Sequence, residues 1–231
     1  MTKVVSFDVG VKNFAYCVCS IEKMNDELNG VTDEATGVTV VTGVKKEKKG
    51  KKEEAKKCSL QIHDWDVIAI VPLLEKVPAL DVIAKGMFTA LDDIVERNPD
   101  ISVVLIENQP CMRNPTMKSV QMLLYSYWAM DNHMTGSNIA IHHISANQKL
   151  KQPADLLSEA PVCTKTGYAK NKWLAVQYAT AYCKGDGELS GKLASSRKRD
   201  DLSDCLLQAI SWLRRGGDDV TGCHRCISAT V

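Results

Sequence analysis

The chain has 231 residues, of which 45% are hydrophobic and 25% are charged, an ordinary globular composition. A formal net charge of +1 excludes a strongly basic protein, so any surface that binds a polyanion must be local. No stretch approaches the roughly 18 apolar residues of a membrane span, and the N-terminal residues lack the pattern of a signal peptide. We expect an intracellular protein with no membrane partner.

Nine cysteines are an odd number, and their wide spacing indicates free thiols in a reducing compartment rather than a disulfide framework. Cys223 and Cys226 form a Cys-x-x-Cys pair, but a structural zinc site needs four ligands and no second pair is evident. We therefore expect free thiols in a C-terminal tail, residues 216–231.

The first part of the chain predicts a β-hairpin followed by a polar insertion. Residues 3–10 and 13–19 are apolar runs of strand length separated by a short turn. Residues 22–36 are polar and residues 45–57 are almost entirely Lys and Glu, so we expect a solvated, mobile insertion near residues 22–60. Residues 59–65 then alternate polar and apolar side chains, which predicts a third strand.

The rest of the chain alternates helices and strands. Apolar residues at helical spacing predict helices over residues 77–97, 116–134, 170–183 and 202–213. Short apolar runs at residues 102–107 and 139–144 predict buried strands. Strands first, then strands alternating with helices, indicate an α/β fold in which a mixed β-sheet is flanked by helices, as one domain over residues 1–215.

Acidic residues occupy distinctive places in these elements. Asp8 lies on the first strand, Glu107 ends a buried strand, and Asp201 and Asp204 begin the last helix. A carboxylate that ends an apolar strand is costly to desolvate unless it is hydrogen-bonded, paired or bound to a cation. Asp201 and Asp204 are three positions apart, which places them on one helix face. Oxygen ligands without nearby His or Cys favour Mg²⁺, with Mn²⁺ as a substitute, over zinc.

Two divalent ions roughly 4 Å apart would suit metal-assisted hydrolysis of a phosphodiester. No Ser-His-Asp or Cys-His arrangement and no Walker loop competes with this interpretation. Simpler explanations exist for two of the acids. Asp200 could merely interact favourably with the N-terminal dipole of the last helix, and we keep it as a possible auxiliary residue of the site. Glu107 could merely start a turn.

Three segments together resemble the poxvirus-type and fungal mitochondrial Holliday junction resolvases, which are relatives of RuvC within the RNase H-like superfamily. The segments are residues 6–13 (SFDVGVKN), residues 106–115 (IENQP followed by RNP) and residues 198–204 (KRDDLSD). The resemblance implies an RNase H-like (RuvC-like) sheet and a homodimer that nicks opposed strands of a four-way DNA junction. It also implies two Mg²⁺ ions in each active site, held by Asp8, Glu107, Asp201 and Asp204.

Similar enzymes carry an active-site lysine upstream of the last acidic pair. Lys172 is our choice over Lys170, although an exposed helix lysine is the alternative for that position. Basic and amide side chains beside the motifs are expected to contact DNA phosphates without reading sequence. These are Lys12, Asn13, Arg113, Asn114, Lys118, Lys170, Arg197, Lys198 and Arg199.

Other functions stay open at this point. The same acids would serve an RNase H-like nuclease that cuts RNA–DNA hybrids or flaps. A nucleotide-binding domain of the actin and sugar-kinase type could use Asp8-Val9-Gly10 as a phosphate loop, but a second glycine-rich segment is missing. A structural DNA binder without catalysis is a further possibility. The resemblance allows two locations, the host cytoplasm for a poxvirus-like protein and the mitochondrion.

Overall fold

The computed structural model describes residues 2–23, 38–42, 56–71, 78–110, 112 and 114–215. The predicted C-terminal tail, most of the polar insertion and the predicted DNA contact Arg113 lie outside the described residues.

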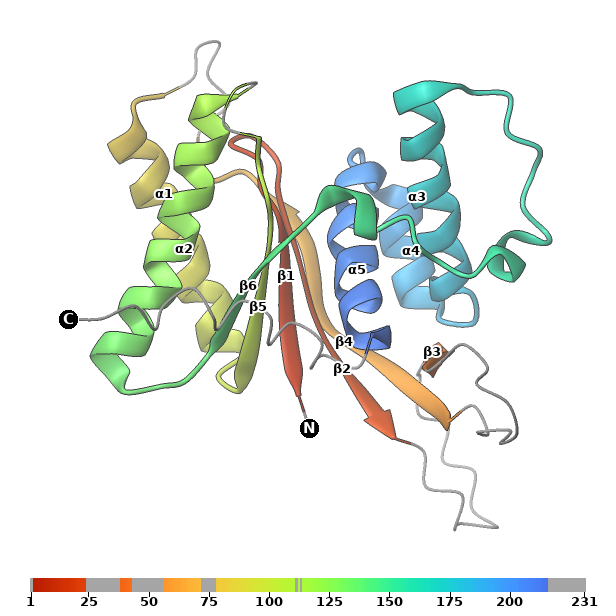
Figure 1. Ribbon diagram of the computed structural model, residues 1–231, viewed down its shortest axis with the longest axis horizontal. Coiled ribbons are helices and arrows are strands. Elements are labelled where there is room, and N and C mark those ends of the chain that lie inside the picture. The colour runs from red at the N-terminus through yellow and green to blue at the C-terminus, as the bar shows by residue number, and fades with distance from the viewer. Residues whose placement is uncertain are drawn as a thin grey trace, which may run out of the picture.

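A six-stranded mixed sheet forms the centre of the molecule, in the order β3-β4-β2-β1-β5-β6 (Figure 1). The strands are β1 (Lys3–Asp8), β2 (Phe14–Lys23), β3 (Val38–Thr42), β4 (Lys56–Ile68), β5 (Ile101–Glu107) and β6 (Ala140–Ile144). Strands β1 to β4 pair in antiparallel fashion, whereas β1, β5 and β6 run parallel to one another. The carboxyl ends of β1, β5 and β6 therefore meet at one edge of the sheet.

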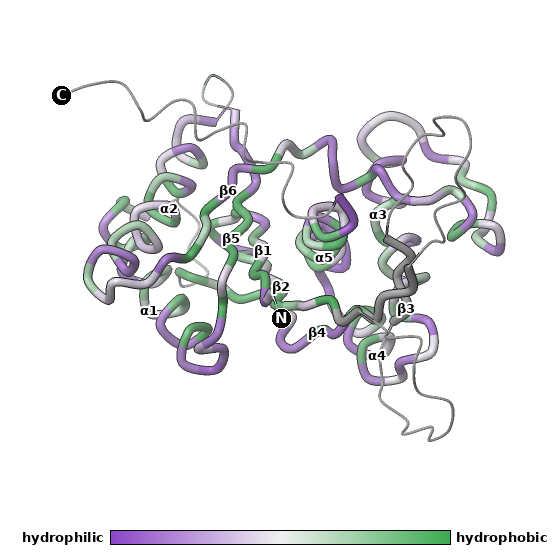
Figure 2. The backbone as a smooth tube through the Cα atoms, turned by 60° about the horizontal axis from the view of Figure 1, so that its bottom comes forward, coloured by the Kyte–Doolittle hydropathy of each residue, from purple (hydrophilic) through white to green (hydrophobic). Residues whose placement is uncertain are grey.

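Helices cover both faces of the sheet (Figure 1). The five α-helices described are α1 (Leu80–Arg97), α2 (Pro115–Thr135), α3 (Gly167–Cys183), α4 (Gly187–Ser195) and α5 (Arg199–Arg214), with short 3-10 turns at Ala146–Gln148 and Ala154–Leu157. Helices α1 and α2 pack one hydrophobic core against β1, β2 and β5, and α3 and α5 pack a second against β2 and β4. Because both faces are covered, β1 and β5 are buried and predominantly hydrophobic, as Figure 2 shows.

Strand alternation assigns each acid of the central strands to a face. Val5 and Phe7 point into the core under α1 and α2, so Ser6 and Asp8 point toward α5. On β5, Ile106 packs in the α1 and α2 core, so Glu107 also faces α5. The parallel register of β1 and β5 aligns Phe7 with Ile106, which brings the ends of the two strands together.

Each helix and strand that the sequence predicted is present, with ends shifted by a few residues, and the mixed α/β fold is confirmed. Strand β3 and helix α4 were not predicted, and β4 begins at Lys56 inside the lysine-rich segment. Valine and threonine dominate β3, which pairs with the edge of β4. Helix α4 begins where the Asp186 carboxylate accepts a hydrogen bond from the Leu189 amide at 2.9 Å. Among the described residues, no helix has both the length and the apolar character of a membrane-spanning segment.

The packing of α1 against the loop after β4 gives a test of the fold. A Cβ atom on Gly86 would lie 1.7 Å from the backbone oxygen of Ile70, so Gly86→Ala must push the helix away. We expect a loss of about 2 kcal/mol in the free energy of unfolding, measured by urea denaturation. The matched control is Gly191→Ala in α4, where nothing lies within 4 Å. That change should stabilise the protein by about 0.5–1 kcal/mol, and equal effects at the two glycines would contradict the packing.

Candidate active site

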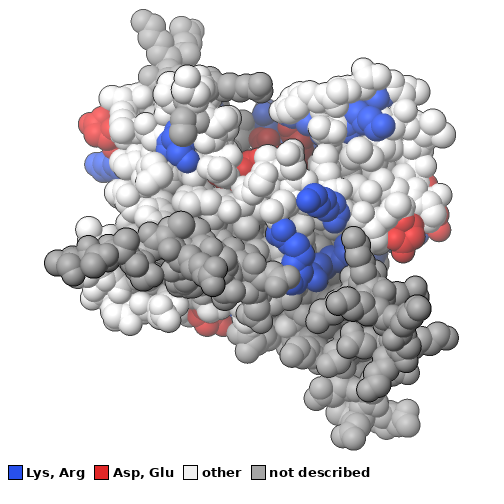
Figure 3. All heavy atoms as spheres, viewed as in Figure 1, with Lys and Arg blue, Asp and Glu red and all other residues white. Residues whose placement is uncertain are grey.

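Three of the four predicted carboxylates come together where β1 and β5 end against α5. Asp8 is the last residue of β1, Glu107 is the last residue of β5, and Asp204 lies in the second turn of α5. Glu107 is only 9% exposed. Figure 3 shows acidic side chains in a recess between the two groups of helices, with basic side chains beside it.

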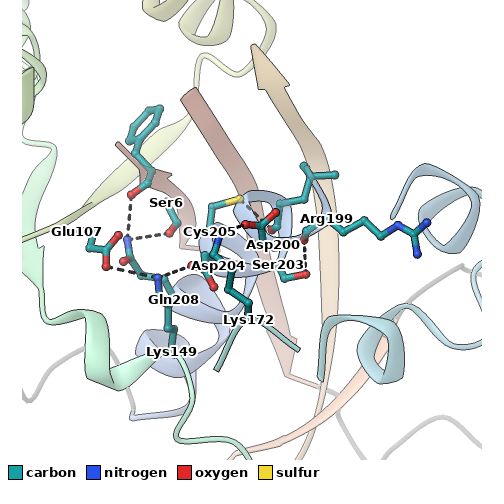
Figure 4. Close-up of polar contacts among 12 residues, drawn as sticks. Ser6, Glu107, Lys149, Lys172, Arg199, Asp200, Ser203, Asp204, Cys205 and Gln208 are labelled. Atoms are coloured by element: carbon teal, nitrogen blue, oxygen red, sulfur yellow. Dashed lines mark hydrogen bonds and ion pairs between the residues drawn. The ribbon is translucent and has the colours of Figure 1, made fainter. Parts of the chain in front are cut away.

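The ammonium group of Lys149 lies between two of these acids (Figure 4). Its Nζ atom is 2.5 Å from an Asp204 oxygen and 3.4 Å from a Glu107 oxygen. Lys149 follows the 3-10 turn after β6, so it reaches the cluster from the third parallel strand. The side chain is 16% exposed, and the sequence analysis did not predict its position.

The pKa values show that the cluster holds more negative charge than its surroundings favour. Burial is the largest cause that raises the pKa of Asp8 well above 3.8, and a hydrogen bond and the charge of Glu107 add to it. Burial also raises the pKa of Asp204, despite the opposing charge of Lys149. Burial alone would lower the pKa of Lys149, but Asp204, Glu107 and Asp8 together raise it. Lys149 is therefore charged and partly neutralises the three carboxylates.

The remaining acids of the last motif form a second group at the start of α5, and the lysines that pair with them are more exposed than Lys149. Lys172 of α3 forms an ion pair with Asp200, and Lys198 lies 3.8 Å from Asp201. Lys172 lowers the pKa of Asp200 although burial opposes it, whereas burial and the charge of Asp200 raise the pKa of Asp201. The structure therefore pairs Lys172, the lysine that we chose from the sequence, with Asp200. A different lysine, Lys149, pairs with Glu107 and Asp204.

A buried amide ties α5 to the strands that carry the acids. Gln208 Nε2 donates to the Ser6 hydroxyl at 3.0 Å, and the backbone oxygens of Phe7 and Leu105 are both 3.4 Å away. Gln208 is one helical turn after Asp204, so these contacts hold the Asp204 carboxylate over the ends of β1 and β5 (Figure 4).

The turn after β1 brings two backbone segments into close contact, because a Cβ on Gly10 would be 2.1 Å from the Asn13 backbone oxygen. Only glycine fits this turn.

The structure places Asn13, Lys118 and Lys198 beside the segments that carry the acids. Asn13 can accept a hydrogen bond from Lys198 at 3.3 Å, which places the first motif beside the last. Asn114 caps α2 by accepting a hydrogen bond from the Met117 amide at 3.2 Å, and Lys118 bonds to Asn108, the residue after Glu107. Four of the other predicted contacts are exposed: Lys12, Lys170, Arg197 and Arg199. Contact with DNA stays a prediction for all of them.

The carboxylates suit a divalent ion by their chemistry. In the described part of the chain, no three or more His, Cys, Asp or Glu side chains have the spacing of a preformed metal site. The Lys149 ammonium group supplies the positive charge between Glu107 and Asp204. Closely spaced carboxylates with raised pKa values nevertheless provide the hard oxygen ligands that Mg²⁺ prefers, so the donor set fits that ion.

Comparisons with known proteins identify the fold. No protein-family model matches the chain. A segment of 120 residues is 32% identical to the uncharacterised protein L451 of Acanthamoeba polyphaga mimivirus, covering 49% of this chain and 29% of that protein. The yeast mitochondrial Holliday junction resolvase Ydc2 is similar in structure over 92% of this chain and 79% of its own, with a TM-score of 0.52 and 18% identity.

Two further solved structures resemble the chain more weakly. Thermus thermophilus RuvC in complex with a Holliday junction matches with a TM-score of 0.48 and 12% identity, over 94% of this chain and 96% of that one. Fowlpox virus resolvase with its junction DNA gives 0.47 and 12%, over 93% and 98%. The likeness to the yeast enzyme shows that the chain has the fold of that resolvase, and the expected mixed sheet flanked by helices is confirmed.

The raised pKa of Asp8 leads to a prediction about stability. A carboxyl group whose pKa is higher in the folded state stabilises the fold below its unfolded value, near 3.8, and that contribution is lost as the pH rises through the folded value. Asn does not titrate, so without divalent ions Asp8→Asn should be more stable than the wild type near pH 8, by about 2 kcal/mol.

The measurement is urea unfolding in EDTA from about pH 4 to pH 8. The stability difference between Asp8→Asn and the wild type should grow with pH. Asp93→Asn, an exposed change on α1, should give no such trend. If the difference in the free energy of unfolding shrinks as the pH rises, the ionised Asp8 carboxylate does not destabilise the fold.

Proposed function

We propose that the protein is a Holliday junction resolvase, an endonuclease that hydrolyses phosphodiester bonds in four-way DNA junctions with the help of Mg²⁺. The observation that carries the proposal is the cluster of Asp8, Glu107 and Asp204, held at one edge of a sheet whose fold is shared with a resolvase. Carboxylates that repel one another inside a fold are costly without a function that uses their charge.

The acids of this chain would hold the ions, with Asp8, Glu107 and Asp204 as the inner ligands and Asp201 beside them. Divalent ions at this position would activate a water molecule and stabilise the departing oxygen of the cleaved phosphodiester. Gln208 would keep the α5 ligand in register with the strand ligands, because it bonds to both β1 and β5.

Two lysines are suited to contact the phosphate that is cut. Lys149 already lies within reach of Glu107 and Asp204, and its ammonium group would pair with the phosphate oxygens on which negative charge develops. Lys172 is the second candidate, because it forms an ion pair with Asp200 in the first turn of α5. The exposed basic residues Lys12, Lys170, Arg197 and Arg199 would hold neighbouring phosphates and supply affinity without sequence preference.

A four-way junction has approximate two-fold symmetry, so a homodimer would present two active sites to opposed strands and make paired nicks. We propose this arrangement together with either a viral cytoplasmic or a mitochondrial setting. The named proteins that resemble the chain include a mimivirus protein, a poxvirus resolvase and a mitochondrial resolvase.

The substrate is tested with the full chain and Mg²⁺ on three labelled substrates, namely a synthetic four-way junction, an RNA–DNA hybrid and a plain duplex. We expect paired symmetric nicks on the junction and little cleavage of the duplex. Preferential cutting of the hybrid would replace the proposal with a ribonuclease function. No cutting of any substrate, together with thermal stabilisation by a nucleotide, would favour a nucleotide-binding domain.

The inner ligands give a second prediction. Asp204→Asn should lower the rate of junction cleavage by about 100-fold or more, because an amide cannot supply the negative charge that a divalent ion needs. Junction binding should persist, since affinity comes mainly from basic residues. The measurement is single-turnover cleavage with a parallel binding titration, and Asp93→Asn is the matched control away from the site. Unchanged cleavage would remove Asp204 from the ligand set.

A further inference from the structure

A second polar cluster lies behind the acidic edge, on the α2 face of the sheet. Its central residue is Gln121, which is fully buried in α2 beside the apolar side chains of Val120 and Leu124. A buried amide costs free energy unless its hydrogen bonds are satisfied. Gln121 must therefore have specific partners, and these partners indicate what the residue holds in place.

The Gln121 side chain joins three segments of the chain. Its Oε1 atom accepts hydrogen bonds from the Gln109 amide at 2.9 Å and from Lys118 Nζ at 3.0 Å. Its Nε2 atom is 2.7 Å from His143 Nδ1 on β6. Because two donors face the oxygen, the amide orientation is fixed and Nε2 must donate. His143 therefore accepts through an unprotonated Nδ1.

The second partner, Lys118, bonds to neutral groups in the described part of the chain rather than to an acid. Its ammonium group bonds to Gln121 and to the Asn108 side chain oxygen at 3.1 Å, both of them neutral groups. Within the described residues Lys118 is in no ion pair, whereas Lys149, Lys172 and Lys198 each pair with an acid. An ammonium group has three donors, so one remains for an outside acceptor.

We propose that Gln121 and His143 are positioning residues that hold Lys118 as a phosphate contact for the DNA strand that passes the Glu107 edge. The inference rests on the proposed function, because it requires a nucleic acid substrate. Asn108 directly follows Glu107, so an ammonium group fixed to Asn108 is one residue from a proposed metal ligand. Gln121 also fixes the Gln109 amide, and the turn after β5 is held at the same time.

The same geometry makes the phosphate contact dependent on pH. Protonation of His143 at Nδ1 would turn an acceptor into a donor that opposes the Gln121 amide. The groups that face the ring are Lys118 and Gln121 of α2, together with Tyr125, whose ring stacks on the imidazole at 5.5 Å. Burial and the charge of Lys118 hold the pKa of His143 below 6.5. The arrangement is therefore complete above pH 6.5 and is disrupted as the pH falls through the lowered value.

The test is a double-mutant cycle on junction binding by full-length protein that carries Asp204→Asn to prevent cleavage. Fluorescence anisotropy with a synthetic four-way junction gives the slope of log affinity against log salt, whose magnitude is about 0.9 for each phosphate that the protein neutralises. Lys118→Met and Gln121→Leu should each reduce the magnitude of the slope by about 0.9, the value for one phosphate contact. The double variant should match Lys118→Met alone, because Gln121 acts through Lys118.

Ser119→Ala on the same helix is the matched control and should leave the slope unchanged. Additive reductions in the double variant, or an unchanged slope for either single variant, would overturn the proposal. A purely structural role for Gln121 would lower stability without this non-additivity. If the parent binds junction no better than duplex and the wild type cuts neither, the proposed function itself fails instead.

His143→Asn is the second variant, and it keeps the test decisive if Gln121→Leu does not fold. Asn offers an acceptor oxygen that does not titrate, so Lys118 should stay in place as the pH falls. As the pH falls from about 7.5 through the lowered pKa of His143, the salt slope of the parent should decrease by about the 0.9 expected for one phosphate contact. The slope of the Asn variant should stay constant over the same range. The other histidines are common to both proteins, so an identical pH response in the two would contradict the role of His143.

Discussion

The structure depends on the grouping of like charges in a partly buried recess. Asp8, Glu107 and Asp204 repel one another at the end of the sheet, and burial makes the repulsion more costly. Lys149 offsets part of this cost, and its ion pairs tie the segment after β6 to α5. The cluster is therefore held together by a cation, and the protein supplies one of its own. A divalent ion would meet the same electrostatic need.

Sheet topology explains why the charges meet. Three parallel strands end at one edge, and strand alternation turns the last side chains of β1 and β5 toward the same helix. The Gln208 amide then locks that helix to both strands. On the opposite face, the Gln121 cluster fixes the turn after β5. The Glu107 edge is thus supported from both sides of the sheet.

Local patterns were enough to predict most of the fold and the acids of the site. Asp8 interrupts the first predicted strand, Glu107 ends the apolar run of another, and Asp204 directly precedes the apolar stretch of the last helix, so each is visible from its immediate neighbours. Lys149 is not visible in this way, because it lies 42 residues from Glu107 and 55 from Asp204. Its place follows from the parallel pairing of β5 and β6, which no local pattern encodes. Had that pairing been assumed, a lysine shortly after β6 would have been a candidate.

The measurement that tests this account most directly compares Lys149→Met with the wild type in urea unfolding near neutral pH, first in EDTA and then with excess Mg²⁺. Without the ammonium group the carboxylates have no cation, so we predict a loss of about 3 kcal/mol in EDTA. Mg²⁺ should recover most of that loss, because the ion replaces the missing charge. Equal stability of the two proteins in EDTA, or a loss that Mg²⁺ does not reverse, would contradict a carboxylate cluster built to hold a cation.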